Sequence, residues 1–187
     1  MQDLAMISLE LVQNSLKANA LHIDLSFILN QRDGTSSLII KDDGIGMDEV
    51  MLSKVSSPFT TSRTTRKVGL GVAFFTQAIQ QAEGFVKFES KLNQGTTIQG
   101  TWKTNHWDAP PLGNLGEVIL IALQSHPDLH LVFTFSFNSS VYTFDSKTFE
   151  TSIAPVPISE LAILKWIESE INLNIEHCKG EIDHEKS

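Results

Sequence analysis

Cysteine is almost absent from the 187-residue chain, which contains only Cys178. One cysteine excludes a disulfide within the chain and leaves no cysteine cluster of the kind that holds zinc. An apolar run of about 18 residues is also missing, and the N-terminus lacks the basic-then-apolar pattern of a secretory signal. These absences predict a cytoplasmic protein that does not enter a membrane.

A surplus of positive charge is missing as well. Residues 1–104 contain ten Lys or Arg and ten Asp or Glu, whereas residues 105–187 contain four and twelve, so the second part carries the whole net charge of −8. Nucleic-acid-binding proteins usually present a basic face, so nucleic acid is not an expected partner. The change in charge falls beside Pro110-Pro111 and predicts a first domain, 1–104, an acidic α/β extension or docking domain, 112–178, and a flexible tail, 179–187.

Residues 3–18 have the periodicity of a helix with two apolar rows. Glu10 and Asn14 lie four residues apart and therefore project from the same face, and Lys17 continues that polar row. The row is either a solvated stripe or part of a metal and nucleotide site. Polar side chains on a largely buried helix need partners, which favours the site.

A second polar cluster follows a predicted strand at about 37–41. The chain there turns through Asp42, Asp43, Gly44 and Gly46. Glycine allows positive φ and lets the backbone approach a ligand closely. Asp42, at the strand end, can accept a hydrogen bond from an amino group on a bound ring. Such stretches are often simple turns, so this one gains weight only from its neighbours.

Residues 54–68 are rich in Ser, Thr and basic side chains, which is typical of a surface loop and also suits a triphosphate. Gly69-Leu70-Gly71 then opens a predicted helix at about 70–82. Free N–H groups and the positive dipole end of a helix N-terminus favour phosphate.

Five short motifs occur in order along the chain: Glu10–Ser15, Asp42–Met47, Ser57–Ser62, Val68–Val72 and Gln94–Thr97. In this order and at these spacings they resemble the GHKL ATP-binding superfamily. Its members include gyrase B subunits, heat-shock chaperones, sensor histidine kinases and the mismatch-repair protein MutL. The resemblance covers roughly residues 3–103, and the short segment with Pro58–Ser62 is most similar to the ATP lid of sensor histidine kinases.

The resemblance implies ATP and Mg²⁺ as cofactors. Asn14 would give its amide oxygen to Mg²⁺, and Glu10 would orient or deprotonate the attacking water. Asp42, rather than Asp43, would accept a hydrogen bond from the adenine amino group. Further nucleotide contacts are expected from Lys17, Gly44, Gly46, Met47, Thr60, Thr61, Ser62, Gly69, Leu70, Gly71, Val72 and Thr97. Met47 could equally be core filler, and β-propensity alone would explain Thr97.

The expected fold is a two-layer α/β sandwich, with a mixed and mostly antiparallel sheet and helices on one face. In the extension the pattern predicts a helix at about 114–125, strands at about 129–137 and 141–145, and a helix at about 158–174. These elements either widen the sheet of the first domain or form a small docking domain.

Two classes of function remain open. In the first, the protein is a slow ATPase or a stand-alone kinase-like catalytic domain that acts on or regulates an unidentified partner protein in signalling. A phosphoacceptor histidine would then belong to another chain, because no histidine here has the context of a dimerising helix. In the second, the protein is a nucleotide-gated interaction switch with negligible turnover.

Overall fold

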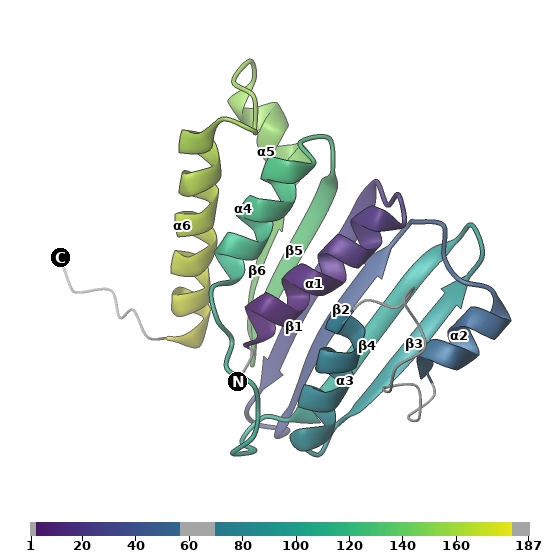
Figure 1. The fold of residues 1–187 in the computed structure, drawn as a ribbon. Helices are drawn as coiled ribbons and strands as arrows, with labels where there is room; N and C mark the ends of the chain where they lie inside the picture. The colour runs from purple at the N-terminus through teal and green to yellow at the C-terminus, as the bar shows by residue number, and fades with distance from the viewer. Residues whose placement is uncertain (1–2, 57–69, 181–187) are drawn as a thin grey trace.

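The structure is a computed structural model that describes residues 3–56 and 70–180. Six strands form one sheet in the order β3-β4-β2-β1-β5-β6. All neighbouring strands are antiparallel except β1 and β5, which are parallel. Figure 1 shows α1, α3, α4 and α6 on one side of this sheet. The predicted mixed α/β sandwich is therefore confirmed.

The first helix, α1 (Leu4–Lys17), begins at a side-chain cap. The carboxylate of Asp3 accepts a hydrogen bond from the Met6 amide at 2.8 Å, which satisfies one of the free N–H groups of the first turn. Its apolar residues pack on the sheet, where Leu4, Leu11 and Val12 are buried. The predicted helix is thus present, but its circumference is not mostly buried, because Glu10, Gln13 and Lys17 are exposed.

In the first part, the strand predicted at about 37–41 is β2 and the helix predicted at about 70–82 is α3. Alternating burial in β1 and β2 places Ile23, Leu25 and Phe27 under the helices, as expected for strands with one covered face. The bounds are β1 His22–Asn30, β2 Thr35–Asp42, α2 Glu49–Ser56, α3 Leu70–Gln81, β3 Phe85–Lys91 and β4 Gly95–Lys103.

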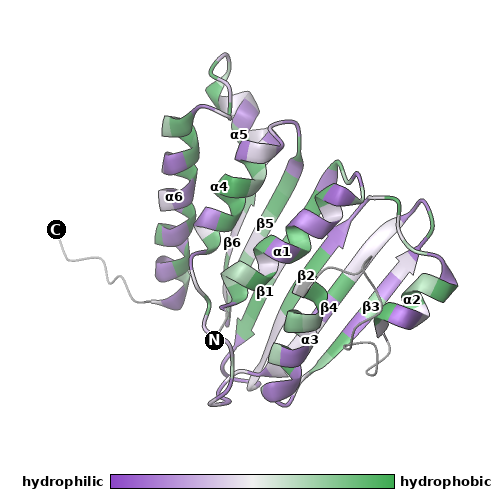
Figure 2. Cartoon of the chain, in the orientation of Figure 1, coloured by the Kyte–Doolittle hydropathy of each residue, from purple (hydrophilic) through white to green (hydrophobic). Residues whose placement is uncertain are grey.

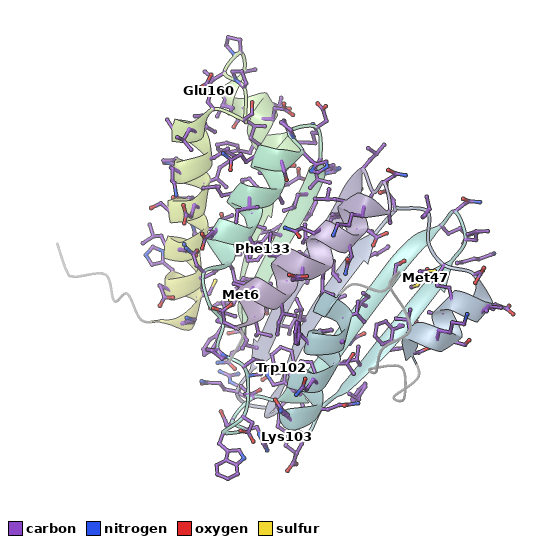
Figure 3. The ribbon with its side chains drawn as sticks, viewed as in Figure 1. Met6, Met47, Trp102, Lys103, Phe133 and Glu160 are labelled. Atoms are coloured by element: carbon purple, nitrogen blue, oxygen red, sulfur yellow. The ribbon has the colours of Figure 1, made fainter. Side chains whose placement is uncertain are left out.

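The extension continues the same sheet. It consists of α4 (Leu115–Ser125), β5 (His130–Phe137), β6 (Ser140–Asp145), α5 (Ser146–Ile153) and α6 (Leu161–Lys179). The β5 strand pairs with β1 from His22↔His130 to Leu29↔Phe137. Phe133, beside α4 in Figure 3, is fully buried. The extension therefore widens the sheet of the first domain and shares its core.

The extension differs from the expectation in two places. The helix α5 was not predicted, and Figure 2 shows it much less hydrophobic than α4. The tail was placed at 179–187, yet Lys179 ends α6 and Gly180 caps it in the left-handed conformation, at φ 74°; residues 181–187 lie outside the described ranges. Within residues 3–56 and 70–180, no helix is long and apolar enough to cross a membrane.

Candidate nucleotide site

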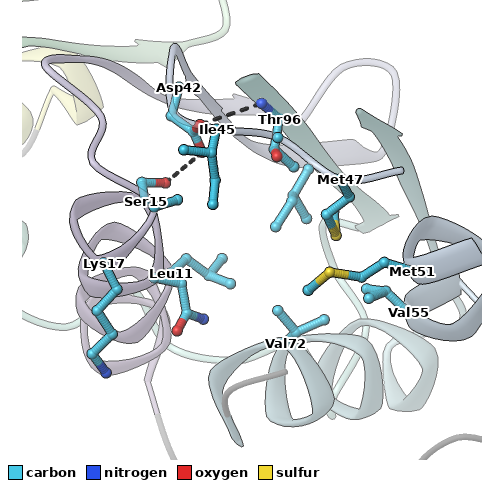
Figure 4. Close-up of a pocket in the computed structure, with 14 residues that line it drawn as sticks. Leu11, Ser15, Lys17, Asp42, Ile45, Met47, Met51, Val55, Val72 and Thr96 are labelled. Carbon is cyan, nitrogen blue, oxygen red and sulfur yellow. Dashed lines mark hydrogen bonds between the residues drawn. The ribbon is translucent and has the colours of Figure 1, made fainter. Parts of the chain in front are cut away.

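A cavity of about 260 Å³ lies where α1, the turn after β2, α2, α3 and β4 meet (Figure 4). Most of its wall is apolar, with a polar group from α1 or β2 at intervals. Its lining residues are Leu11, Asn14, Ser15, Lys17, Ala18, Asp42, Ile45, Gly46, Met47, Met51, Val55, Val72, Thr96 and Ile98. This composition suits a flat, largely apolar ring with a few polar groups at its edge.

Asp42 is the acidic group of this cavity, and its side chain is held in place from three sides. It is buried, with 8% of its surface exposed. One carboxylate oxygen accepts a hydrogen bond from the Ser15 hydroxyl at 2.7 Å, and the other accepts from the Gly44 amide at 2.9 Å and the Thr96 amide at 3.3 Å. These donors fix the carboxylate at the wall of the cavity, where it can accept one further hydrogen bond from a ligand.

The adjacent Asp43 has a different position. Its carboxylate accepts hydrogen bonds from the amides of Leu21 and His22, both at 2.8 Å, and it does not line the cavity. Asp43 is exposed and holds the start of β1.

The two glycines of the turn are required mainly by protein backbone. A Cβ on Gly46 would lie 2.1 Å from the Lys91 carbonyl oxygen, and its φ is 64°. A Cβ on Gly44 would lie 2.7 Å from the Ala18 carbonyl oxygen. The backbone of this turn therefore packs closely between the end of α1 and the β3–β4 turn. This packing, which the sequence did not reveal, explains why glycine is needed at both positions. Gly46 also lines the cavity, whereas Gly44 does not.

Asn14 and Glu10, predicted to act together, are placed differently. Asn14 lines the cavity, and its Nδ2 is buried without a hydrogen-bond partner. Glu10 is exposed and is not among the lining residues, so the idea that it lies on a buried surface was wrong. A Cβ added at Gly71 would lie 2.5 Å from the Cβ of Glu10, so Glu10 lies against the first turn of α3. Lys17 is exposed at the rim.

Thr97 does not reach this cavity. Thr96 and Ile98 line it, and successive strand residues point to opposite faces, so Thr97 lies on the other face of β4. There it borders a shallow hollow with Lys41 and Glu89. The Thr96 hydroxyl lies 3.0 Å from that of Ser90, and its side chain points into the cavity in Figure 4. Thr96 rather than Thr97 therefore faces this cavity, and the nucleotide contact expected of Thr97 stays a prediction.

The apolar walls were largely missed. Met47 and Val72 were expected and do line the cavity, but Leu11, Ile45, Met51, Val55 and Ile98 were not singled out. Ile45 is a large apolar residue that is 52% exposed. Its position between the two glycines of the turn was the one sequence feature that could have indicated a role in lining the cavity. The expected contacts Thr60, Thr61, Ser62 and Gly69 lie outside the described residues, as does the side chain of Leu70.

The residues present fit a Mg²⁺ ion that is held mainly by its nucleotide. Among the described residues, no three His, Cys, Asp or Glu side chains lie close enough to hold a metal. Mg²⁺ bound to nucleotides usually takes only one or two protein ligands together with phosphate oxygens. The unpartnered side-chain amide of Asn14 can supply one such ligand, because rotating the amide group by half a revolution places its oxygen where Nδ2 now lies.

Comparisons with known proteins agree with this site. Residues 2–106 match the model of a family described as "Histidine kinase-, DNA gyrase B-, and HSP90-like ATPase". The chain is 30% identical over 92 residues to sensor histidine kinase YvrG and 29% identical over 91 residues to sporulation kinase B, both from Bacillus subtilis. The matches cover 47% and 48% of this chain but only 16% and 21% of those proteins.

Among solved structures, the N-terminal domain of a DNA repair protein is similar with a TM-score of 0.49 and 15% identity, over 78% of this chain and 52% of that one. The family model spans more than half of the chain and includes every described polar residue of the cavity. The chain therefore belongs to the histidine kinase-, DNA gyrase B- and HSP90-like ATPase family, and this membership implies that it binds ATP.

Proposed function

We propose that this chain is a Mg²⁺-dependent ATP-binding domain that works as a slow ATPase or as a kinase-like catalytic domain for a partner protein. The observation that carries the proposal is the cavity with two fixed polar groups, Asp42 at one wall and the unpartnered amide of Asn14 at another. A nucleotide needs both a group that recognises its base and a group that recognises its charged phosphates.

In this proposal Asp42 accepts a hydrogen bond from the adenine amino group. Its carboxylate is already held by Ser15, Gly44 and Thr96, so binding requires no reorientation. The ring lies against the apolar side chains of Ile45, Met47 and Ile98, which line the same cavity. Burial of these walls supplies affinity, and the carboxylate supplies the choice of an amino-bearing base.

Asn14 and the first turn of α3 act on the phosphates. Asn14 holds the Mg²⁺–triphosphate unit through its amide, and the N-terminus of α3, with Val72 buried at the cavity, faces it with free N–H groups. Mg²⁺ neutralises phosphate charge that would otherwise face Asp42. Glu10, one helical turn before Asn14, orients or deprotonates the attacking water at the edge of the site.

One observation favours the second candidate, a nucleotide-gated switch with negligible turnover. Glu10 is exposed and lies outside the cavity wall, so among the described residues Asp42 is the one carboxylate that lines the cavity with Asn14. Nucleotide binding would then serve only to change the surface offered to a partner. The relatives named as kinases support a partner protein, with ATP and Mg²⁺ supplied by the cytoplasm.

Calorimetry with ATP, with and without Mg²⁺, tests the binding half of the proposal. Wild-type protein should bind ATP more tightly with Mg²⁺ than with excess chelator, and Asn14→Ala should remove most of that difference. Gln13→Ala is the matched control, since Gln13 is the exposed neighbour on α1. Equal affinity with and without the metal in wild-type protein would refute the role of Asn14.

Phosphate release separates the two candidates. If Glu10 is a general base, Glu10→Gln should keep ATP affinity while lowering turnover by about 10²–10⁴-fold. If the chain is a switch, both proteins should release phosphate equally slowly. Turnover that is rapid in wild type and unchanged in Glu10→Gln would leave only the binding role.

A further inference from the structure

Four ionisable side chains form a chain of contacts on the sheet, away from the nucleotide cavity. The Nδ1 atoms of His22 and His130 lie 3.0 Å apart. The Nε2 of His22 lies 3.0 Å from Asp24 Oδ1, and the Nε2 of His130 lies 3.2 Å from Asp145 Oδ1. We call Asp24, His22, His130 and Asp145 the histidine clasp.

The strand register explains why these side chains meet. His22 and His130 are direct partners in the parallel pairing of β1 with β5. Asp24 lies two residues along β1 and so shares the face of His22, while Asp145 pairs with Val132 at the end of β6. The two histidine side chains are 34% and 37% exposed, and their rings meet edge to face, with centroids 4.4 Å apart.

The contacts of the four ring nitrogens determine how many protons the two rings share. Each Nε2 faces an acceptor-only carboxylate and must carry a proton to donate. The two Nδ1 atoms at 3.0 Å are attractive only if one of them also carries a proton. Three protons on two rings correspond to one imidazolium and one imidazole. With both rings neutral, two protons serve three contacts, so one contact brings two acceptors together; with both rings charged, two N–H groups face each other at the centre.

We propose that the histidine clasp is a binding site for a single proton shared between His22 and His130, and that this proton fastens the extension to the first domain. The clasp joins β1, which belongs to the first domain, to β5 and β6 of the extension. Loss of the proton leaves two protons for the three contacts, so one contact then brings two acceptors together and the clasp is weakened.

Each end of the clasp is tied to a structural element. The amide of His22 donates to Asp43, the residue after Asp42 in the nucleotide turn. Asp145 caps α5 by accepting from the amides of Lys147 and Thr148 at 2.9 and 3.0 Å. The proton therefore lies on a continuous path from the nucleotide turn to the extension.

Other charged groups near the clasp come from three elements. Lys41 on β2 is the register partner of Asp24, and Asp43 holds the backbone of His22. Lys147 on α5 has its ammonium on Glu150 at 2.9 Å, so it does not neutralise Asp145 directly. Apart from the proton, the clasp carries two negative charges, which favours uptake of a single positive one.

Nuclear magnetic resonance of protein labelled with ¹⁵N in histidine tests the proton count directly, without nucleotide. At pH 7 we expect a coupling across the hydrogen bond between the Nδ1 atoms of His22 and His130, with a strongly downfield ring proton. Both signals should vanish in His130→Gln and persist in His126→Gln, since the ring of His126 contacts Ser125, outside the clasp. Two neutral rings without the coupling would overturn the proposal.

A metal is the main competitor, because two convergent Nδ1 atoms backed by carboxylates could also hold Zn²⁺. The spectra are therefore recorded after chelator treatment and again with added Zn²⁺. Survival of the coupling in the chelated sample supports the shared proton. The shared proton would be refuted in favour of a metal site if the coupling is absent from the chelated sample and stoichiometric Zn²⁺ shifts the signals of both rings.

Unfolding measured against pH gives a second test. The folded clasp holds one proton that the separate imidazoles of the unfolded chain lose near their ordinary value of about 6.5. The unfolding constant of wild type relative to His130→Gln should thus rise as the pH increases above that value, because the folded clasp keeps a proton that the unfolded chain has released. His126→Gln should leave the dependence unchanged. A ratio independent of pH would contradict the clasp, and neither experiment depends on ATP binding.

Discussion

At the residue scale, the cavity depends on which of two adjacent aspartates faces it. Asp42→Asn should weaken ATP binding by roughly 1.5–3 kcal/mol, or about 10–150-fold, the range for a hydrogen bond to a charged group. Asn at this position can also turn an NH₂ group toward the Ser15 hydroxyl, whose present acceptor is the carboxylate. Calorimetry with ATP and Mg²⁺ measures the change.

Asp43→Asn is the matched control for that substitution. Its oxygen can still accept from the Leu21 and His22 amides, so ATP affinity should change by less than about threefold. Equal losses in both variants would show that the adenine contact has been assigned to the wrong residue.

The location of a side chain could be predicted where its place in the backbone pattern was distinctive. Asp42 follows a strand and precedes two glycines, and this pattern located it correctly in the cavity. Thr97 does not line the cavity and its neighbour Thr96 does, because the register of β4 decides which threonine faces inward and the sequence has threonine at both positions. Ile45 and Met51 were missed because apolar residues are ordinary in any turn or helix.

At the element scale, Gly71 sets the distance between α1 and α3. A Cβ there would lie 2.5 Å from the Cβ of Glu10, so Gly71→Ala should force the helices apart and cost about 1–3 kcal/mol of stability. Chemical denaturation measures the loss.

A double-mutant cycle with Glu10→Gly identifies the cause of that loss. Removing the opposing Cβ should recover part of the cost of Gly71→Ala, beyond what each substitution contributes alone. Additive effects would mean that helix propensity, rather than the contact between α1 and α3, explains the loss.

The N-terminus of α5 depends on the charge of Asp145. Burial opposes ionisation of this carboxyl, but hydrogen bonds from the Thr148 amide, His130 and the Lys147 amide outweigh it and hold the pKa of Asp145 below its ordinary value of 3.8. A lowered pKa stabilises the fold above the ordinary value, and this stabilisation is lost as the pH falls through the folded value.

Asp145→Ala should therefore cost about 0.5–2 kcal/mol at pH 7, the usual worth of a helix cap. Asp145→Asn keeps a cap acceptor and should cost less. The difference between wild type and Asp145→Asn should shrink at pH values below 3.8, as measured by urea unfolding at several pH values. A difference that grows in acid would contradict the assigned direction.

Most elements could be predicted from periodicity, because their apolar faces repeat at helical or strand spacing. The exception is α5, which has few apolar residues and whose start is set by the Asp145 cap. The start of α6 was also misplaced by a few residues: it begins at Leu161, where Glu160 offers no side-chain cap that would mark it in the sequence.

At the scale of the whole molecule, the sheet class and the ATPase family were predicted correctly. The relation between the two parts was left open, because pairing of β1 with β5 is a long-range contact with no local sequence signal. The charge boundary at about residue 105 marks a change of surface, while the core continues across it: Phe27 and Phe133, one from each part, have ring centroids 6.1 Å apart.

The parallel pairing of β1 with β5 has a consequence for any shortened form of the chain. A fragment that ends at residue 104 would leave β1 as an unpaired edge strand, with the hydrogen-bonding groups that now pair with β5 open to water. Such an edge is a template on which another copy can add its own strand. The fragment should form dimers or larger aggregates in light scattering, while the full chain should not, and Ile28→Lys on β1 should make the fragment more soluble. The acidic extension would then protect the edge of β1 from pairing with the same strand of another copy.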